Sequence, residues 1–366
     1  MRLERGALLL PLIIILNAAP LRADLALESE DFTLKFDGRL RIGYIERYES
    51  GENESSANDR FLVEKAWLGF NGTCFDDFSY EMLWELRGYL EEGGPVEAKN
   101  IRIMYSPHKS LRFHLGQFKV PFGRKFIVAW PSRNSILLPA VAGSFLPQRD
   151  VGLMAQMSAL DGKCGLYSGV FTGQGSNRKR DDGAGKKLYV ARIEATPLGS
   201  APKSEGDAEM SPGLRLVLGA GYASSEDAEP PAKEAAYLRT IDGKKELIGF
   251  DVTLKYKGLF LSYENNHAKL EPEAAPEFEA GGFLVQGSYF VRSLKLEPRV
   301  MYDEFDPSDS AAGDKEKTVT YGVNVLLHDG EMKIMLEYAD HHKLDDGDER
   351  GWTEDELRLM VQMTIH

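Results

Sequence analysis

The residues between Gly116 and Arg149 combine charge and backbone features that neither a helix nor a strand explains. The stretch carries five basic residues and no acid, in a chain of 366 residues whose formal net charge is −13. These basic residues are Lys119, Arg124, Lys125, Arg133 and Arg149. The prolines at positions 121, 131, 139 and 147 each remove a backbone donor and break regular structure. Positive charge fixed in a confined space can attract and select small anions.

Further basic residues precede this stretch and raise its local charge. From Val96 to Arg149 there are nine Lys or Arg residues against one acid, Glu97. Because side chains alternate along a strand, Arg102 and Arg112 have the parity opposite to their apolar neighbours and should point away from an apolar face. The candidate anion-contacting residues are therefore Arg39, Arg41, Arg102, Arg112, Arg124, Lys125, Arg133 and Arg149.

For some of these cations, pairing with a nearby acid is a simpler interpretation than contact with anions. Arg39 and Arg41 alternatively balance nearby acids on the polar face, namely Asp37, Glu81 and Glu85. Arg149 alternatively pairs with its neighbour Asp150. No acid lies among Arg124, Lys125 and Arg133, and this favours a functional role for these three, with their charged groups in water.

Catalytic, metal-binding and redox chemistry have little support in the sequence. His108 falls in a turn, His114 stands alone on a polar face, and His341 and His342 lie at a loop edge. No Ser–His–acid arrangement is visible by spacing, although such sites converge only in space. The two cysteines form neither a CxxC nor a CxxCH motif. We predict no enzymatic activity, no metal site and no cofactor, and the negative net charge argues against a nucleic-acid partner.

The N-terminus predicts export. Arg2 and Arg5 precede an apolar run over residues 7–16, and Ala23 offers a small residue for cleavage, so residues 1–23 are predicted to be a signal peptide. Beyond them no apolar run approaches the ~20 residues of a membrane helix. The exported chain, residues 24–366, is therefore a membrane β-barrel or a soluble secreted β protein.

Alternation of apolar and polar residues favours the barrel. Sixteen segments alternate in this way, and short and long connections follow one another in turn, which is typical of outer-membrane barrels with short periplasmic turns and long extracellular loops. Residues 199–212 are interpreted as one overlong turn. We predict an all-β, transmembrane antiparallel β-barrel of about 16 strands in the outer membrane. The alternation assigns Val323 and Leu336 to the lipid face and Asn324 to water.

The proline-rich stretch connects the fifth and sixth predicted strands on the extracellular side. A barrel of this size encloses an aqueous channel wide enough for a loop. We predict that the third loop folds inward, with its apolar residues on the inner wall and its basic groups in water. The alternative is a loop that crosses the barrel mouth or forms a subunit contact.

Three segments carry a resemblance to a known family. They are FDGRLRIGY (residues 36–44), GQFKVPFG (residues 116–123) and RDVGL (residues 149–153). With the sixteen strands, they resemble the phosphate-selective porin O and P family of Gram-negative outer membranes. The resemblance implies a homotrimer in outer-membrane lipid, with a third loop that narrows the pore and basic residues that attract small, phosphate-like anions. One departure is the C-terminal His366, where such barrels usually end in an aromatic residue.

Two other membrane functions stay open at this stage. A general or cation-preferring porin is favoured by the acidic loops at 269–279, 303–316 and 345–349. The chain alternatively forms the barrel sheath of a larger outer-membrane conduit that holds a separate redox protein.

The strand count predicts that Cys74 and Cys164 are free thiols. Four strand spacings of about 4.8 Å place them about 19 Å apart around the wall, whereas a disulfide needs Cα atoms within about 7 Å. Both thiols should react with a maleimide in the denatured, unreduced protein. Labelling of neither thiol would contradict the strand count in this part of the chain.

Overall fold

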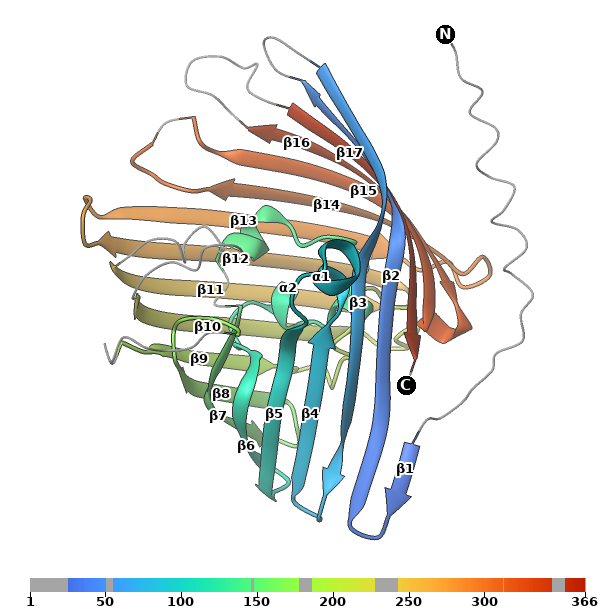
Figure 1. The fold of residues 1–366 in the computed structure, drawn as a ribbon, viewed down its shortest axis with the longest axis vertical. Coiled ribbons are helices and arrows are strands. Elements are labelled where there is room, and N and C mark those ends of the chain that lie inside the picture. The colour runs from blue at the N-terminus through green and yellow to red at the C-terminus, as the bar shows by residue number, and fades with distance from the viewer. Residues whose placement is uncertain are drawn as a thin grey trace.

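The structure is a computed structural model that describes residues 26–50, 55–145, 148–177, 186–227, 243–311, 313–343 and 353–365. The predicted signal peptide and His366 lie outside these ranges. Sixteen strands form a single closed antiparallel barrel (Figure 1), which confirms the predicted fold class. Among the described residues, no helix has the length and apolar character needed to cross a membrane.

The strands follow one another around the ring in chain order. The first half comprises β2 (Phe32–Ser50), β3 (Ser55–Cys74), β4 (Phe78–Glu85), β5 (Glu97–His108), β6 (Leu111–Lys119), β7 (Arg149–Ala159), β8 (Cys164–Phe171) and β9 (Leu188–Ala195). The second half comprises β10 (Arg215–Asp227), β11 (Gly243–Tyr256), β12 (Leu259–Pro272), β13 (Phe278–Tyr289), β14 (Leu296–Asp306), β15 (Glu316–Leu327), β16 (Met332–Lys343) and β17 (Thr353–Ile365).

The ring closes between its first and last strands. β17 pairs with β2 from Thr353 opposite Ser50 to Ile365 opposite Gly38. A short additional strand, β1 (Ala26–Ser29), pairs with the beginning of β2. β2 and β3 are long strands whose pairing continues to Ser50 opposite Ser55, within a polar stretch of the sequence. Backbone hydrogen bonds do not require apolar side chains, so a hairpin can extend beyond the membrane.

Burial alternates along the strands as the sequence predicts. Val323 and Leu336 are 40% and 47% exposed on the outer face, whereas Met335 and Met360 are completely buried on the inner face. An outer apolar surface is what a lipid-facing wall requires.

The third loop (residues 120–148, of which 146 and 147 are not described) folds into the barrel, as predicted. It contains three short helices, α2 (Arg124–Ile127), η2 (Trp130–Ser132) and α3 (Ala140–Ser144). Figure 1 shows α2 within the ring of strands. Phe122, Phe126, Val141 and Phe145 belong to a buried cluster with inner-wall residues of β6 to β14.

Two smaller apolar contacts hold the loop to the opposite side of the ring. Trp130 packs edge-on against Trp67 of β3, with 5.5 Å between the ring centroids. Ile136 packs on Met335 of β16 and Met360 of β17. The loop therefore spans the lumen and is supported on several sides, which excludes the alternative of a loop lying across the mouth.

A second segment enters the lumen from the opposite end. Residues 196–214 connect β9 and β10, at the barrel end that carries the short turns, and we call them the inserted turn. The Glu205 backbone N–H donates to Ser132 O of the third loop at 2.8 Å. Asp207 is completely buried and accepts a hydrogen bond from Gly258 N at 2.7 Å. The overlong turn of the sequence analysis is thus a folded element that meets the third loop.

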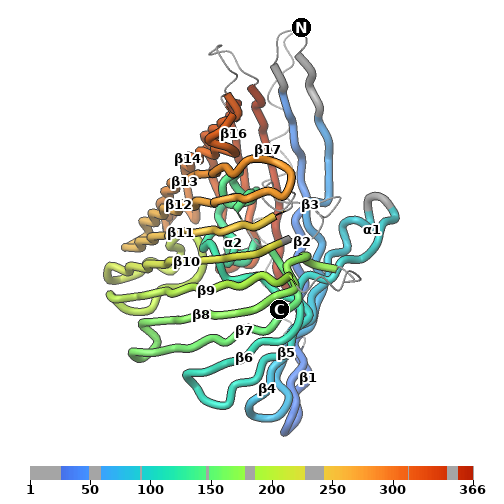
Figure 2. Tube along the Cα trace, turned by 90° about the vertical axis from the view of Figure 1, so that its left-hand side faces the viewer, coloured from blue at the N-terminus to red at the C-terminus, as the bar shows by residue number. Residues whose placement is uncertain are grey.

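The connection between β4 and β5 takes a different direction. It contains the helix α1 (Arg87–Glu92). Figure 2 shows that α1 extends away from the barrel wall. The third loop and the inserted turn therefore occupy part of the lumen, while α1 lies outside it.

Two sequence expectations about individual residues have clear outcomes. Cys74 ends β3, Cys164 begins β8, and both are free, as predicted. Asn324 faces inward, but the expectation that it lies in water is wrong, because it is 1% exposed and its Nδ2 donates to Asn134 O at 2.8 Å. The third loop covers this part of the inner wall.

Replacing Leu153 with Arg tests the lipid face. Leu153 is 48% exposed on the outside of β7, so the new charge would enter lipid and should destabilise the barrel by ~2–4 kcal/mol near the bilayer midplane. Gln156 of the same strand faces inward, with its Oε1 3.1 Å from His114 Nε2, and Gln156→Arg is the matched control. Urea unfolding in lipid vesicles measures the free energy of unfolding of both variants. Equal destabilisation would contradict the assignment of faces.

Candidate functional site

The third loop is held in the lumen by hydrogen bonds from basic side chains to its carbonyl oxygens. Lys119 Nζ, at the end of β6, donates to Val128 O at 2.9 Å and also to Phe126 O and Ile127 O. Lys333 Nζ of β16 donates to Pro131 O at 2.8 Å, and Arg41 Nη1 of β2 donates to Ile136 O at 2.6 Å. Irregular backbone buried in a protein needs such partners, because no strand ladder supplies them.

Carboxylates satisfy the backbone N–H groups of the same loop. Glu264 of β12 accepts from Lys125 N at 2.8 Å, and Glu337 of β16 accepts from Ile136 N at 2.9 Å. Glu205 of the inserted turn accepts from Asn134 N at 3.1 Å. The acids that are missing from the loop sequence are therefore supplied by the wall and by the inserted turn.

The expectation that the basic groups of the loop face water is wrong for Arg124, Lys125 and Arg133. Their exposed fractions are 7%, 4% and 7%. Arg124 lies 3.7 Å from Glu194, and Arg133 donates to the loop carbonyls Val128 O and Phe126 O. The sequence did not reveal this burial, because the partners of these side chains come from parts of the chain far from the loop.

Lys125 lies at the contact between the third loop and the inserted turn. Its Nζ lies 2.9 Å from Glu205 Oε2 and 2.7 Å from Gln286 Oε1. Burial lowers the pKa of Lys125, and Glu205 opposes that shift. Burial raises the pKa of Glu205, but Lys125 and Arg133 together bring it below its usual value. Burial lowers the pKa of Arg133 to about 10, so this guanidinium remains charged at neutral pH.

Arg41 also has a buried position, at 1% exposure. It lies 3.4 Å from Glu64, the residue left unpaired at a β-bulge in β3, and its guanidinium carbon lies 4.7 Å from the centre of the Trp130 ring. The predicted pairing of Arg41 with a luminal acid is therefore present, but the acid is Glu64. Arg39 does pair with Asp37, as the simpler interpretation expected.

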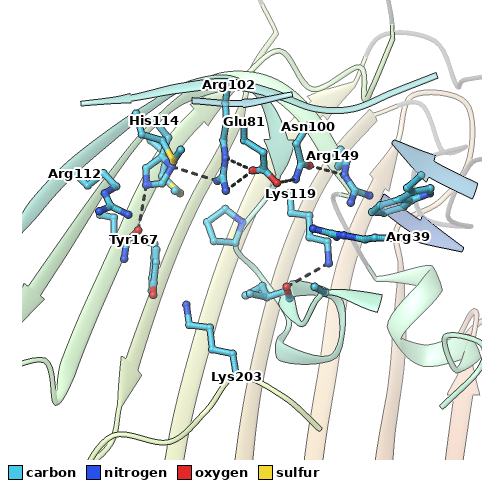
Figure 3. Close-up of a pocket in the computed structure, with 17 residues that line it drawn as sticks. Arg39, Glu81, Asn100, Arg102, Arg112, His114, Lys119, Arg149, Tyr167 and Lys203 are labelled. Carbon is cyan, nitrogen blue, oxygen red and sulfur yellow. Dashed lines mark hydrogen bonds and ion pairs between the residues drawn. The ribbon is translucent and has the colours of Figure 1, made fainter. Parts of the chain in front are cut away.

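The remaining predicted cations line one open cavity beside the third loop. The cavity measures about 380 Å³ and lies between the loop residues Pro121, Ile127 and Ala129 and the inner wall of β2 to β8. Figure 3 shows its charged lining. The lining contains one acid, Glu81, and six basic residues, Arg39, Arg102, Arg112, Lys119, Arg149 and Lys203.

The cations of this cavity differ in how they are paired. Arg102 Nη2 lies 2.7 Å from Glu81, so this pair is close to neutral. Arg112 Nε donates to Ser106 Oγ and Arg149 Nε donates to Asn100 Oδ1, both at 2.9 Å. Asp150, the expected partner of Arg149, instead accepts hydrogen bonds from Thr172 and Gly173. Within the described residues, no ion pair joins an acid to Arg112, Arg149 or Lys203.

Lys203 is a functional candidate that the sequence analysis missed. It comes from the inserted turn, and its Nζ lies 5.9 Å from the centre of the Tyr167 ring in the cavity (Figure 3). Proline and glutamate surround it in a segment that resembles solvent-exposed turn sequence. The segment is much longer than the other short turns of the chain. Only this length could have indicated from the sequence that the segment enters the lumen.

A second cavity borders the first on the side of the short periplasmic turns. It measures about 330 Å³ and shares Arg39 and Ala129 with the basic cavity. Its lining includes the acids Asp329 and Glu331, which lie in the short turn between β15 and β16. Arg39 therefore stands where the basic cavity passes into a more acidic exit.

A closed barrel with an inward third loop and a basic cavity defines an outer-membrane porin. The family model of the phosphate-selective porin O and P matches residues 34–365, and the chain belongs to this family. Porins are channels without enzymatic activity, so the predicted family, outer-membrane location and absence of an enzyme are confirmed. No curated protein sequence matches the chain.

Solved structures share the fold at low sequence identity. The anion-selective porin from Comamonas acidovorans has a TM-score of 0.64 at 11% identity, covering 92% of this chain and 100% of its own. A trimer form of OmpT from Vibrio cholerae has a TM-score of 0.61 at 14% identity, covering 92% and 100%. The outer-membrane channel DcaP of Acinetobacter baumannii has a TM-score of 0.59 at 11% identity, covering 93% and 99%.

A double-mutant cycle tests the contact between the loop and the inserted turn. Glu205→Gln leaves the buried Lys125 ammonium without its counter-charge and should cost ~3–5 kcal/mol of barrel stability. Adding Lys125→Met removes the uncompensated charge and should restore part of that loss. Urea unfolding of the two single variants and the double variant gives the coupling free energy between Lys125 and Glu205. Additive losses would show that the two side chains are energetically independent.

Proposed function

We propose that this porin lets small anions, phosphate among them, diffuse passively through the basic cavity beside the third loop. The observation that carries the proposal is the charge of the lining, six cations against one acid that already pairs with Arg102. With Asp37 included, because it pairs with Arg39, the formal excess is 6 − 2 = +4 in a chain whose net charge is −13. Local placement, rather than net charge, decides which ions enter a pore.

The physical reason is confinement. Around an exposed charge in open water, salt screens the field over ~8 Å. Inside the cavity, apolar groups of Trp67, Met104 and Pro121 replace part of that water, so the fixed charges act more strongly. Guanidinium and ammonium groups also donate charge-assisted hydrogen bonds to phosphate oxygens. Arg112, Arg149 and Lys203 are the groups best placed to do so, because Glu81 occupies Arg102.

The buried cations Arg41 of β2 and Arg124, Lys125 and Arg133 of the third loop act indirectly in this proposal. Their hydrogen bonds and ion pairs keep the third loop against the wall. They thereby confine the passage to the β2–β8 side, where the other cations stand. We further propose that residues 1–23 direct export and that the porin is a homotrimer, a state supported by the family resemblance.

The alternative is a general or cation-preferring porin. The observation that favours it is the acidic exit, where Asp329 and Glu331 line the second cavity. In this alternative a solute passes both cavities in turn, and the sign of selectivity depends on which cavity has the stronger field at the narrowest point.

Charge reversal in the cavity tests the proposal. The double variant Arg112→Glu with Lys203→Glu changes the local charge by 2 × 2 = 4 units without touching the buried loop contacts. The reversal potential in a salt gradient across a planar bilayer should move from anion preference towards zero or cation preference. The size of the shift should fall at high salt because of screening.

Lys109 and Lys163 provide the matched control. Both are exposed in short turns outside the cavity, so Lys109→Glu with Lys163→Glu makes the same charge change in open water. This control should leave the reversal potential nearly unchanged. Equal shifts in the two double variants, or a cation preference in the unmodified protein, would contradict the proposed function.

A further inference from the structure

Three potential metal ligands meet on the inner wall, away from the basic cavity. His341 of β16 stands directly opposite Glu354 of β17 in the strand register. Glu356 lies two residues further along β17 and therefore projects from the same face. Glu337, which holds the third loop, lies four residues before His341, so these ligands stand about 13 Å beyond that contact along the strand, towards the extracellular end.

The three side chains are already close to a ligand arrangement. One ligand atom from each lies within 4.8 Å of the other two. Glu354 and Glu356 are 8% and 2% exposed. His341 Nδ1 lies 2.8 Å from Thr318 Oγ1, which orients the ring and leaves Nε2 for another partner. Metal-binding histidines characteristically have such a hydrogen bond on their second nitrogen.

The Glu356 carboxylate is incompletely satisfied by its present neighbours. Glu356 Oε1 is buried and has no hydrogen-bond partner among the described residues. Arg47 Nε lies 2.9 Å from Glu354 Oε1 and forms an ion pair with it. Arg47 Nε itself has no hydrogen-bond partner within the described residues. Arg47 Nη2 is 3.6 Å from Glu356 Oε2, which is also bound by Arg358. A buried polar atom without a partner is costly, so a better-fitting cation would stabilise this site.

We propose that His341, Glu354 and Glu356 bind one divalent transition-metal ion, with Zn²⁺ as the best match, in exchange for Arg47. One imidazole nitrogen and two carboxylate oxygens suit Zn²⁺, whereas Ca²⁺ and Mg²⁺ take oxygen ligands. Tetrahedral bonds of ~2.1 Å bring ligand atoms to about 3.4 Å from one another, which small side-chain rotations achieve from the present distances. The Arg47 side chain is 43% exposed, so its displacement would transfer its charge to water.

The proposed site does not depend on the anion-selective function. It stands on β16 and β17, whereas the basic cavity is lined by β2 to β8, the third loop and the inserted turn. The sequence analysis predicted no metal site, because His341 was assigned to a loop edge and its ligand partners lie across a strand pair. Only the register of β16 against β17 brings the three together.

Calorimetric titration of the full-length, detergent-solubilised protein with Zn²⁺ tests the proposal. One ion should bind per chain, and His341→Ala and Glu356→Gln should each weaken binding by about 10-fold or more. Arg47→Ala removes the competing cation and should tighten binding, an effect that a purely structural role for these residues would not produce. Co²⁺ absorption bands typical of tetrahedral coordination should appear in the unmodified protein and disappear in His341→Ala.

The neighbouring histidine provides the control. His342 points outward and lies 2.7 Å from Asp340, so His342→Ala should leave the affinity unchanged. Heat-modifiable gel mobility confirms that each variant is folded. Absence of Zn²⁺ binding, equal weakening by His341→Ala and His342→Ala, or weaker binding in Arg47→Ala would overturn the proposal.

Discussion

An irregular chain segment inside a barrel must find a partner for every buried peptide group, and the rest of this structure depends on how the third loop does so. Its prolines and short helices leave carbonyl and N–H groups that no strand ladder satisfies. Cations such as Lys119 and Lys333 donate to the carbonyls, and carboxylates such as Glu264 and Glu337 accept from the N–H groups. The loop therefore folds inward because the wall is polar at matching positions.

This arrangement divides the basic residues into two groups with different physical roles. Arg41 and Lys125 are buried among loop and wall atoms, where their hydrogen bonds fix the loop. Arg112 and Lys203 remain at the surface of the cavity that the fixed loop leaves open. The first group holds the third loop in the lumen, and the second group gives the cavity beside the loop a positive lining. An acidic protein can thus contain a basic passage, because its acids are used elsewhere on the wall.

The fold could be predicted from the sequence, whereas the site could be predicted only in part. Strand alternation repeats over sixteen segments and depends only on local residue order. It therefore predicted the barrel and the inward direction of Arg102 and Arg112. Parity says which face a side chain takes, but not what covers that face. Asn324 and Arg133 were expected in water for this reason. Lys203 and Glu205, the charged partner of Lys125, belong to an inserted turn whose sequence carries no periodic signal.

The closure between β17 and β2 constrains how the barrel folds. Thr353 pairs with Ser50, so residues 353 − 50 = 303 positions apart must meet before the ring is complete. Contacts of such long sequence separation form slowly, because the entropy of closing the chain is lost before the pairing is gained. Until β17 arrives, β2 and β16 each present an open edge whose backbone groups lipid cannot hydrogen-bond. The thirteen residues of β17 therefore determine whether the preceding strands can remain in a membrane.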